Sequence, residues 1–111
     1  MKFPKPGKPV RGSKSGSSIM ALFDLLGRSW ALGVIWQLKE GACTFRQLQE
    51  RCESVPPATL NKRIKELTEA RLIERIVHGY ILTNEGKDLL NRIKPLKEWS
   101  YVWAEKFKEE D

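Results

Sequence analysis

The sequence has very few of the side chains that carry most catalytic and metal chemistry. Its 111 residues include one histidine and two cysteines. Cys43 and Cys52 are separated by eight residues, which fits neither the common zinc patterns nor a CxxC motif, so we predict no metal site, no cofactor and two reduced thiols. The GxSxG, HExxH, P-loop and GxGxxG motifs are absent as well. These absences argue against an enzyme, because one histidine leaves few acid–base schemes.

Long apolar runs are also missing. The longest, from Ile19 to Leu26, already contains Asp24 and is far shorter than the roughly 18 residues that a membrane span needs. The basic start of the chain leads into glycine, serine and lysine and not into the apolar core of a signal peptide. With 41% hydrophobic residues and a mean hydropathy of -0.46, the chain is expected to form one domain that stays in the cytoplasm without membrane contact.

Acidic residues are missing from the first 18 positions. Five of the chain's 20 basic residues lie there, so the remaining positions hold 15 basic residues against all 14 acidic ones, and most of the net charge of +6 belongs to this segment. It is rich in proline, glycine and serine and too polar to bury much surface, so residues 1–18 are predicted to be a flexible basic arm. Such an arm is either a solvated leader or a segment that follows a DNA backbone.

Two apolar helices are predicted at the start of a domain over residues 19–111. Residues 19–26 form the first helix, which ends at Gly27 and needs cover on two sides. Residues 30–38 are predicted to form the second helix, and Gly41 is the residue expected to stop it. Because the second helix is apolar nearly all round, we expect it at the centre of the core.

The pattern of a helix-turn-helix follows. Thr44 and Gln47 form a capping box that starts a third helix, and a turn over residues 53–56 leads to a fourth helix over about residues 57–70. The apolar stripe of the fourth helix repeats at i, i+4 and i+7 and consists of Leu60, Ile64 and Leu67. The residues expected to point away from it are Ala58, Lys62, Lys65 and Glu66. Two helices joined by so short a turn are typical of a helix-turn-helix.

A β-hairpin and further helix are predicted after it. Two β-rich runs, residues 72–77 and 80–83, flank His78-Gly79, which is typical of a tight hairpin turn. Thr83 is expected to cap a helix over residues 84–94, and Pro95 kinks that helix or begins a new one. The last segment places an apolar stripe on one helix face: Leu96, Trp99, Trp103 and Phe107.

Six fragments in this order resemble the HxlR-type transcriptional regulators, relatives of the MarR group. They are residues 26–30 (LGRSW), 35–38 (IWQL), 45–48 (FRQL), 59–67 (TLNKRIKEL), 72–75 (LIER) and 82–86 (LTNEG). The resemblance spans roughly residues 19–104. It implies a mainly α winged helix-turn-helix with a small two-stranded β-wing, acting as a homodimeric repressor or activator that binds double-stranded DNA.

The resemblance also implies that the first and last helices build the dimer interface. The apolar side chains predicted there are Leu22, Phe23, Leu96, Trp99, Trp103 and Phe107. This agrees with the residues themselves, since so much apolar surface exceeds what a small monomer exposes. The alternative is a ligand pocket, and a small-molecule effector is left open.

In such a fold the second helix of the helix-turn-helix, here residues 57–70, enters the major groove. The predicted DNA-binding residues on it are Ala58, Thr59, Asn61, Lys62, Arg63 and Lys65. Asn61 suits adenine and Thr59 a thymine methyl or a phosphate, whereas the lysines suit phosphates. Further contacts are predicted from the preceding helix and the wing: Thr44, Arg46, Gln47, Arg75 and His78.

Each of these residues has a purely structural alternative. Arg63 with Glu66, or Lys65 with Glu69, forms an ion pair on a solvated helix face. His78 simply suits a tight turn, and the two cysteines are small core residues unless they act as a redox switch. The alternative for the whole domain is a winged-helix protein-protein interaction module without specific DNA binding, because this fold serves both purposes.

Three departures from the family pattern stand out. Many relatives carry a cysteine just ahead of the first helix, where this chain has Ser17, so sensing by that thiol is not carried over. The wing is shortened around His78-Gly79, which limits its reach into a minor groove. Pro56 replaces the usual capping serine before the recognition helix, and Arg71 replaces the usual glycine before the wing.

Overall fold

The computed structural model describes residues 4–9 and 16–109. It is mainly helical with one two-stranded antiparallel sheet, as predicted. The elements in chain order are α1 (Ser18–Leu26), α2 (Ala31–Gln37), α3 (Phe45–Arg51), α4 (Pro57–Glu69), β1 (Ile73–Ile76), β2 (Gly79–Leu82), α5 (Asn84–Ile93) and α6 (Pro95–Glu105).

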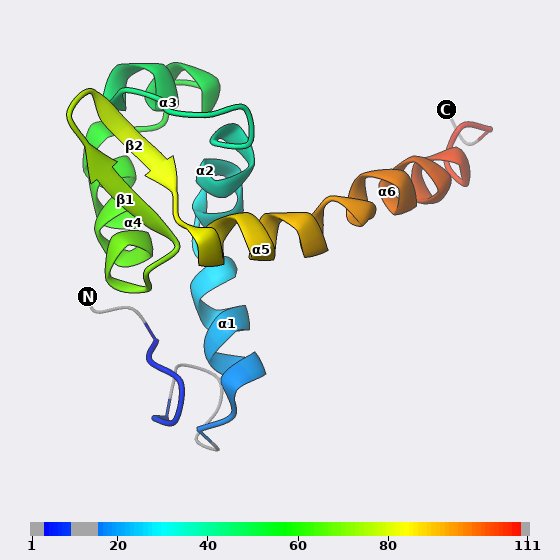
Figure 1. Cartoon of the computed structure of the whole chain (residues 1–111). Helices are drawn as coiled ribbons and strands as arrows, with labels where there is room; N and C mark the ends of the chain where they lie inside the picture. The colour runs from blue at the N-terminus through cyan, green and yellow to red at the C-terminus, as the bar shows by residue number, and fades with distance from the viewer. Residues whose placement is uncertain (1–3, 10–15, 110–111) are drawn as a thin grey trace.

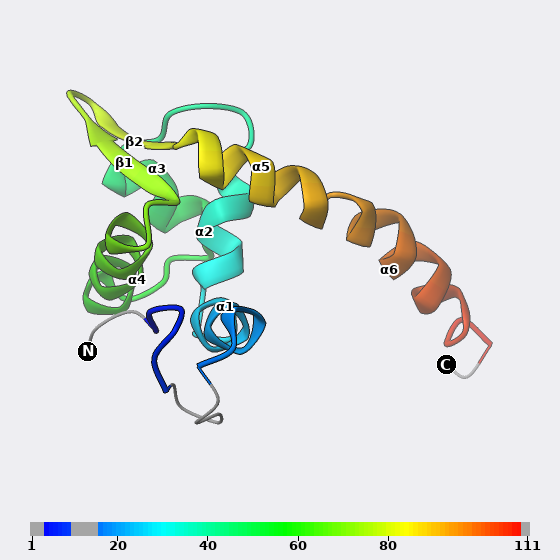
Figure 2. The ribbon, with the colours of Figure 1, turned by 60° about the horizontal axis from the view of Figure 1, so that its bottom comes forward.

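The described elements form a compact body from which two helices extend (Figures 1 and 2). α3, α4 and the hairpin lie on one side of α2, α1 extends below it, and α5 crosses it and leads into α6, which reaches away on the opposite side. The core gathers apolar side chains from most of these elements: Leu25, Val34, Ile35, Leu38, Leu48, Leu60, Leu67, Ile73, Leu82 and Leu90. As predicted, α2 is central, since its Ala31, Val34 and Ile35 are buried.

The helix-turn-helix is fixed by local hydrogen bonds. The predicted capping box is present: the Gln47 N–H donates to Thr44 Oγ1 at 3.1 Å and the Thr44 N–H to Gln47 Oε1 at 2.9 Å. α3 ends where Glu53 takes a left-handed conformation (φ 55°), and the Ser54 N–H returns to the Gln49 carbonyl at 2.9 Å. Pro57 occupies the first turn of α4, whose N-cap Pro56 makes no side-chain cap.

α4 ends in a Schellman motif with an arginine at the position where glycine is favoured. The Leu72 N–H donates to the Leu67 carbonyl and the Arg71 N–H to the Thr68 carbonyl, both at 3.0 Å. Arg71 itself is left-handed, with φ 64°. Arg71 therefore adopts the backbone conformation that glycine favours at this position.

Replacing Arg71 by glycine should raise the free energy of unfolding by about 0.5–1 kcal/mol. A left-handed conformation costs an L-residue about 1–2 kcal/mol, and the greater freedom of glycine in the unfolded chain returns part of that gain. Urea unfolding followed by circular dichroism measures the change. Arg75→Gly on β1 is the matched control and should lower stability, because glycine weakens a strand; a loss with both variants would contradict the explanation.

The hairpin turn lies one residue earlier than predicted. Ile76 pairs with Gly79, so the two-residue loop is Val77-His78 and Gly79 is the first residue of β2. The reason is a close approach of backbones: a Cβ on Gly79 would lie 2.2 Å from the Cys43 carbonyl oxygen. Cys43 and Tyr80 form a β-bridge there, with N–H···O distances of 3.0 and 2.8 Å. Gly79 therefore serves the contact between the wing and the segment before α3.

Two predicted helix bounds are also wrong. α2 begins at Ala31 because Trp30 is left-handed, with φ 68°. It ends at Gln37, before the predicted end, because the Leu38 N–H is shared between the Val34 and Ile35 carbonyls and the next residues continue as turns. Gly41 (φ 128°) lies beyond these turns and does not end the helix. Thr83 caps α5 as predicted, accepting a hydrogen bond from the Gly86 N–H at 3.0 Å.

Part of the predicted flexible arm lies back on the domain. Pro4 is buried, and the Gly7 N–H donates to the Gly16 carbonyl at 3.1 Å. Pro4 and Pro6 line a small apolar hollow together with Leu22, Leu25 and Leu72. Residues 4–9 thus pack near α1, whereas Lys2, Arg11 and Lys14 lie outside the described residues.

Among the described residues, no single helix is long and apolar enough to cross a membrane; α1 and α2 reach that length and composition only together, with a bend of 81° between them. The same part of the chain contains no group of three or more His, Cys, Asp and Glu side chains that could hold a metal ion.

Candidate nucleic-acid interface

The outer face of α4 carries five of the eleven predicted DNA-binding residues. Ala58, Asn61, Lys62 and Lys65 are exposed, and Thr59 is half-buried at the edge of this face. On the opposite face, Leu60, Ile64 and Leu67 are buried in the core. The spacing of the exposed residues therefore places them along one side of the helix from Ala58 to Lys65, and the exposed Glu69 follows on that side at the end of the helix.

Glu66, predicted to point outward, is buried with 3% exposure. Its carboxylate accepts a hydrogen bond of 2.7 Å from Arg28 Nη1 and pairs with the Arg63 guanidinium. The outward prediction is wrong because two guanidinium groups bind this carboxylate on the inner side of α4. As a result, no exposed acidic residue lies between Pro57 and Thr68.

Arg63 faces the protein and not the outer face of α4. Its Nε donates to the Ser29 carbonyl at 2.7 Å, and its side chain is 15% exposed. The predicted pairing of Arg63 with Glu66 is present, but inside the domain and not on a solvated face. The other predicted pair, Lys65 with Glu69, is not among the ion pairs of the described residues.

The start of α3 presents three further predicted residues at the surface. Thr44, Arg46 and Gln47 are all exposed. The side chains of Thr44 and Gln47 cap each other's backbone, so they hold the helix end in place. Arg46 pairs only loosely with Glu50, at 3.8 Å with 89% of the arginine side chain exposed, and can reach a phosphate without losing a buried partner.

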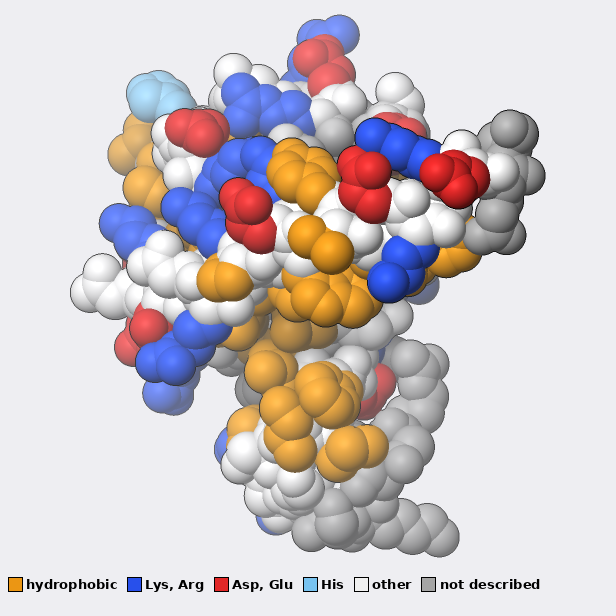
Figure 3. Space-filling view, turned by 90° about the vertical axis from the view of Figure 1, so that its right-hand side faces the viewer, with side chains coloured by type: hydrophobic (Ala, Val, Ile, Leu, Met, Phe, Trp, Pro, Cys, Tyr) orange, Lys and Arg blue, Asp and Glu red, His pale blue; other side chains and the backbone are white. Residues whose placement is uncertain are grey.

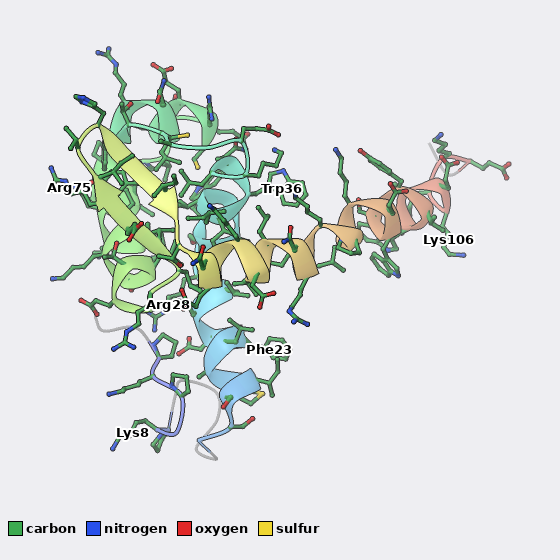
Figure 4. The ribbon with its side chains drawn as sticks, viewed as in Figure 1. Lys8, Phe23, Arg28, Trp36, Arg75 and Lys106 are labelled. Atoms are coloured by element: carbon green, nitrogen blue, oxygen red, sulfur yellow. The ribbon has the colours of Figure 1, made fainter. Side chains whose placement is uncertain are left out.

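The wing places Arg75 on β1 and His78 in the turn, both exposed. Arg75 lies on the outer edge of the hairpin, on the side of the molecule opposite Phe23 and Trp36 (Figure 4). The tip also carries Val77, which is 91% exposed. Sequence reasoning missed Val77 because it assigned this residue to a paired strand.

The opposite side of the molecule carries an apolar area below a band of charged side chains (Figure 3). Viewed from that side, hydrophobic side chains gather over α1 and the underside of α6 (Figure 3). Five of the six predicted interface residues are 48–62% exposed, and Leu22 is half-buried. The exposed ones are Phe23, Leu96, Trp99, Trp103 and Phe107. Ile19, Leu32, Tyr101 and Val102, which the sequence analysis did not select, are also exposed there or on the same helices.

The aromatic side chains of the C-terminal segment form a ladder. The Trp99 and Trp103 rings stack with centroids 5.9 Å apart, and Phe107, in the turn after α6, meets Trp103 edge-on at 5.6 Å. At the base of α6 an open apolar hollow of about 260 Å³ is lined by Leu32, Trp36, Leu90 and Leu96, among others. The aromatic ladder and the hollow at the base of α6 are parts of the same apolar surface.

Both cysteines are free and buried. Cys43 Sγ lies 3.0 Å from Arg51 Nη1. Burial raises the pKa of the Cys52 thiol, and Cys43 and Glu53 raise it further. Cys52 is therefore a core residue with little thiolate character.

A helix-turn-helix whose second helix exposes a polar and basic face, followed by a two-stranded wing, defines a winged helix-turn-helix protein. The HxlR-like helix-turn-helix family model matches residues 25–108, so the chain belongs to this family of transcriptional regulators.

Relatives and solved structures agree with this assignment. An uncharacterized HTH-type transcriptional regulator of Methanocaldococcus jannaschii is 28% identical over 90 residues, which cover 78% of this chain and 85% of that protein. Mycobacterial relatives are longer, and the match covers 57% of their length. The crystal structure of quinone-bound YodB from Bacillus subtilis has a TM-score of 0.65 at 28% identity, covering 80% of this chain and 97% of that one.

A possible HxlR family transcriptional factor from Thermoplasma volcanium is similar in structure as well. Its TM-score is 0.69 at 25% identity, with 82% of this chain and 85% of that chain covered. The winged-helix architecture predicted from the sequence is therefore confirmed.

Proposed function

We infer that this protein is a homodimeric transcriptional regulator that binds double-stranded DNA sequence-specifically, has no enzymatic activity, and acts in the cytoplasm where the DNA is. The observation that carries the inference is the withdrawal of Glu66 from the outer face of α4. A helix that approaches phosphates gains from a basic and neutral face, and on α4 this face extends from Ala58 to Lys65 before the exposed Glu69 at the end of the helix.

The residues of this face divide into two roles. Asn61 suits a bidentate contact to adenine, and Thr59 suits a thymine methyl. Lys62 and Lys65 are assigned to phosphates, together with Arg46 at the start of α3. Arg75 and His78 are placed on the wing, where they reach the DNA beside the groove that α4 enters; Arg63 is not assigned to DNA, because it binds Ser29 and Glu66.

Homodimerisation is part of the proposal. The apolar surface of α1 and α6 contains more exposed aromatic side chains than a small monomer keeps in water. It lies away from the wing, so two copies joined there can both present α4 to one duplex. Half-sites about one helical turn apart, roughly 34–36 Å, are expected on such a duplex.

A small-molecule effector also belongs to the proposal. A solved relative is described as quinone-bound, so quinones are the first class of compound to test in thermal unfolding. The thiol of Cys52, being buried with a raised pKa, is not the expected point of attack.

The replacement of Lys65 by alanine should weaken DNA binding and make it less dependent on salt. For duplex DNA the logarithm of affinity falls by about 0.9 per decade of salt for each phosphate contact, so loss of one contact per protomer should lower the slope of a dimer by about two. Fluorescence anisotropy with a labelled duplex between 50 and 300 mM salt, roughly the range over which such slopes are read, measures it.

The matched control is Lys87→Ala, which removes the same charge from the exposed surface of α5. It should leave both affinity and slope nearly unchanged. Equal losses in the two variants would indicate general attraction by net charge. Absence of duplex binding by the unmodified protein at low salt would favour the protein-interaction module instead.

A further inference from the structure

Four charged side chains join the corner between α1 and α2 to the inner side of α4. Arg28, in the link between α1 and α2, contacts Asp24 of α1 at 3.5 Å through Nη2 and Glu66 of α4 at 2.7 Å through Nη1. Arg63 of α4 pairs with the same Glu66 carboxylate. We call Asp24, Arg28, Arg63 and Glu66 the corner clamp.

A second connection runs from α4 to the backbone of the corner. Arg63 Nε donates to the carbonyl of Ser29, the residue after Arg28, at 2.7 Å. The next residue, Trp30, is left-handed, and α1 and α2 meet at 81°. The clamp therefore binds both the side chains and the main chain at the point where the direction of the chain changes between α1 and α2.

The corner clamp is shielded from water. The side chains of Asp24 and Glu66 are each 4% exposed, that of Arg28 is 7% exposed and that of Arg63 is 15% exposed. Buried ion pairs add little stability compared with apolar side chains of similar size, because the attraction between the charges is offset by their loss of hydration. What they do provide is a defined relative position, since guanidinium and carboxylate groups bind with fixed directions.

We propose that the corner clamp is a positioning device that fixes the angle between α1 and α4, and so sets the distance at which the two recognition helices of a dimer meet the DNA. This inference rests on the proposed function, in which α1 belongs to the dimer interface and α4 enters the major groove. In that arrangement α1 contacts the partner subunit and α4 contacts the bases. A rigid connection between these two helices therefore determines the spacing of half-sites that the dimer accepts. Asp24, Arg28, Arg63 and Glu66 do not touch DNA in this arrangement.

The test is the tolerance of half-site spacing. Duplexes are first selected from a random pool by the unmodified protein, and one or two base pairs are then inserted between the half-sites. The unmodified protein should bind the altered duplexes more than about tenfold more weakly, because the DNA has to twist or bend to restore the fit. Arg28→Met with Glu66→Met removes the central pair of the corner clamp, and with it the contacts of Asp24 to Arg28 and of Arg63 to Glu66, and should reduce this penalty to less than about threefold.

Two controls separate positioning from a general loss of structure. Asp88→Met with Arg92→Met removes an exposed ion pair of α5, 3.5 Å long, and should leave the spacing penalty unchanged. Dimer mass and unfolding temperature are measured on every variant. If Arg28→Met with Glu66→Met does not fold, Arg63→Gln, which breaks the connection to Ser29 and leaves Arg28 bound to Glu66, takes its place in the same assay.

The outcomes distinguish the inference from the function on which it rests. A folded, dimeric clamp variant that binds the selected duplex but has lost spacing discrimination supports the positioning role. An unchanged spacing penalty in a folded clamp variant overturns it while leaving the proposed function intact. Failure of the unmodified protein to select any duplex overturns the proposed function itself.

Discussion

Replacing Trp99 and Trp103 together by alanine should convert the proposed homodimer into monomers. A buried tryptophan at an interface centre contributes about 2 kcal/mol or more, and a two-fold axis makes each replacement count twice. The dissociation constant of the dimer should therefore rise by at least about 10⁴-fold. Both side chains are more than half exposed in the single chain and stack on each other 5.9 Å apart, so their loss leaves no cavity in the core.

Sedimentation of the variant at micromolar concentration measures the expected halving of mass. DNA binding should weaken in parallel, with a salt dependence about half as steep, because a monomer neutralises half as many phosphates. Val77→Ala is the control: Val77 is 91% exposed, but it lies at the wing tip and should leave the mass unchanged. A Trp99 and Trp103 double variant that still sediments as a dimer would place the interface elsewhere.

Gly86→Ala should destabilise the fold although alanine is the better helix former. Gly86 lies in the first turn of α5, and a Cβ there would lie 2.0 Å from the carbonyl oxygen of Leu72. This oxygen cannot easily move, since it accepts a hydrogen bond of 3.0 Å from the Thr83 N–H. Overpacking of this kind costs about 3 kcal/mol or more, against a gain of about 1 kcal/mol from helix propensity.

The net loss of about 2 kcal/mol or more corresponds to a fall of roughly 10 °C in the melting temperature of a domain of this size. Calorimetry or thermal circular dichroism measures it. Lys87→Ala, at the next position on the same helix but exposed, should change stability by less than about 0.5 kcal/mol. Equal stability of Gly86→Ala and the unmodified protein would show that the contact between the start of α5 and Leu72 is not tightly packed.

The elements that sequence reasoning placed correctly are those with local chemical signals. Thr44 with Gln47 and Thr83 mark helix starts through hydrogen bonds to residues three positions away, so they can be read from sequence neighbours. The stripe of Leu60, Ile64 and Leu67 likewise follows from helix periodicity. Secondary structure and the inner face of α4 were predictable for this reason.

The wrong predictions concern positions whose structure depends on residues that are distant in the sequence. Glu66 was predicted to be exposed because helix periodicity considers only neighbouring residues. Its partner Arg28 lies 38 positions earlier in the chain. The hairpin turn shifted because Gly79 approaches the backbone of Cys43, a contact between separate segments. The left-handed Trp30 and the early end of α2 depend in the same way on how the corner packs. A sequence pattern has no access to such tertiary contacts.

In the proposed complex with DNA, the β-bridge between Cys43 and Tyr80 lowers the entropic cost of binding. Because Thr44, the cap of α3, directly follows Cys43, the hydrogen bonds of 3.0 and 2.8 Å attach the wing to the segment that carries α3. The wing and the helix-turn-helix are then two DNA-binding elements with no flexible linker between them. When one of them binds, the other is already positioned for its own contacts with the DNA. Little conformational entropy is lost when the second arm binds, so even a short wing adds to affinity.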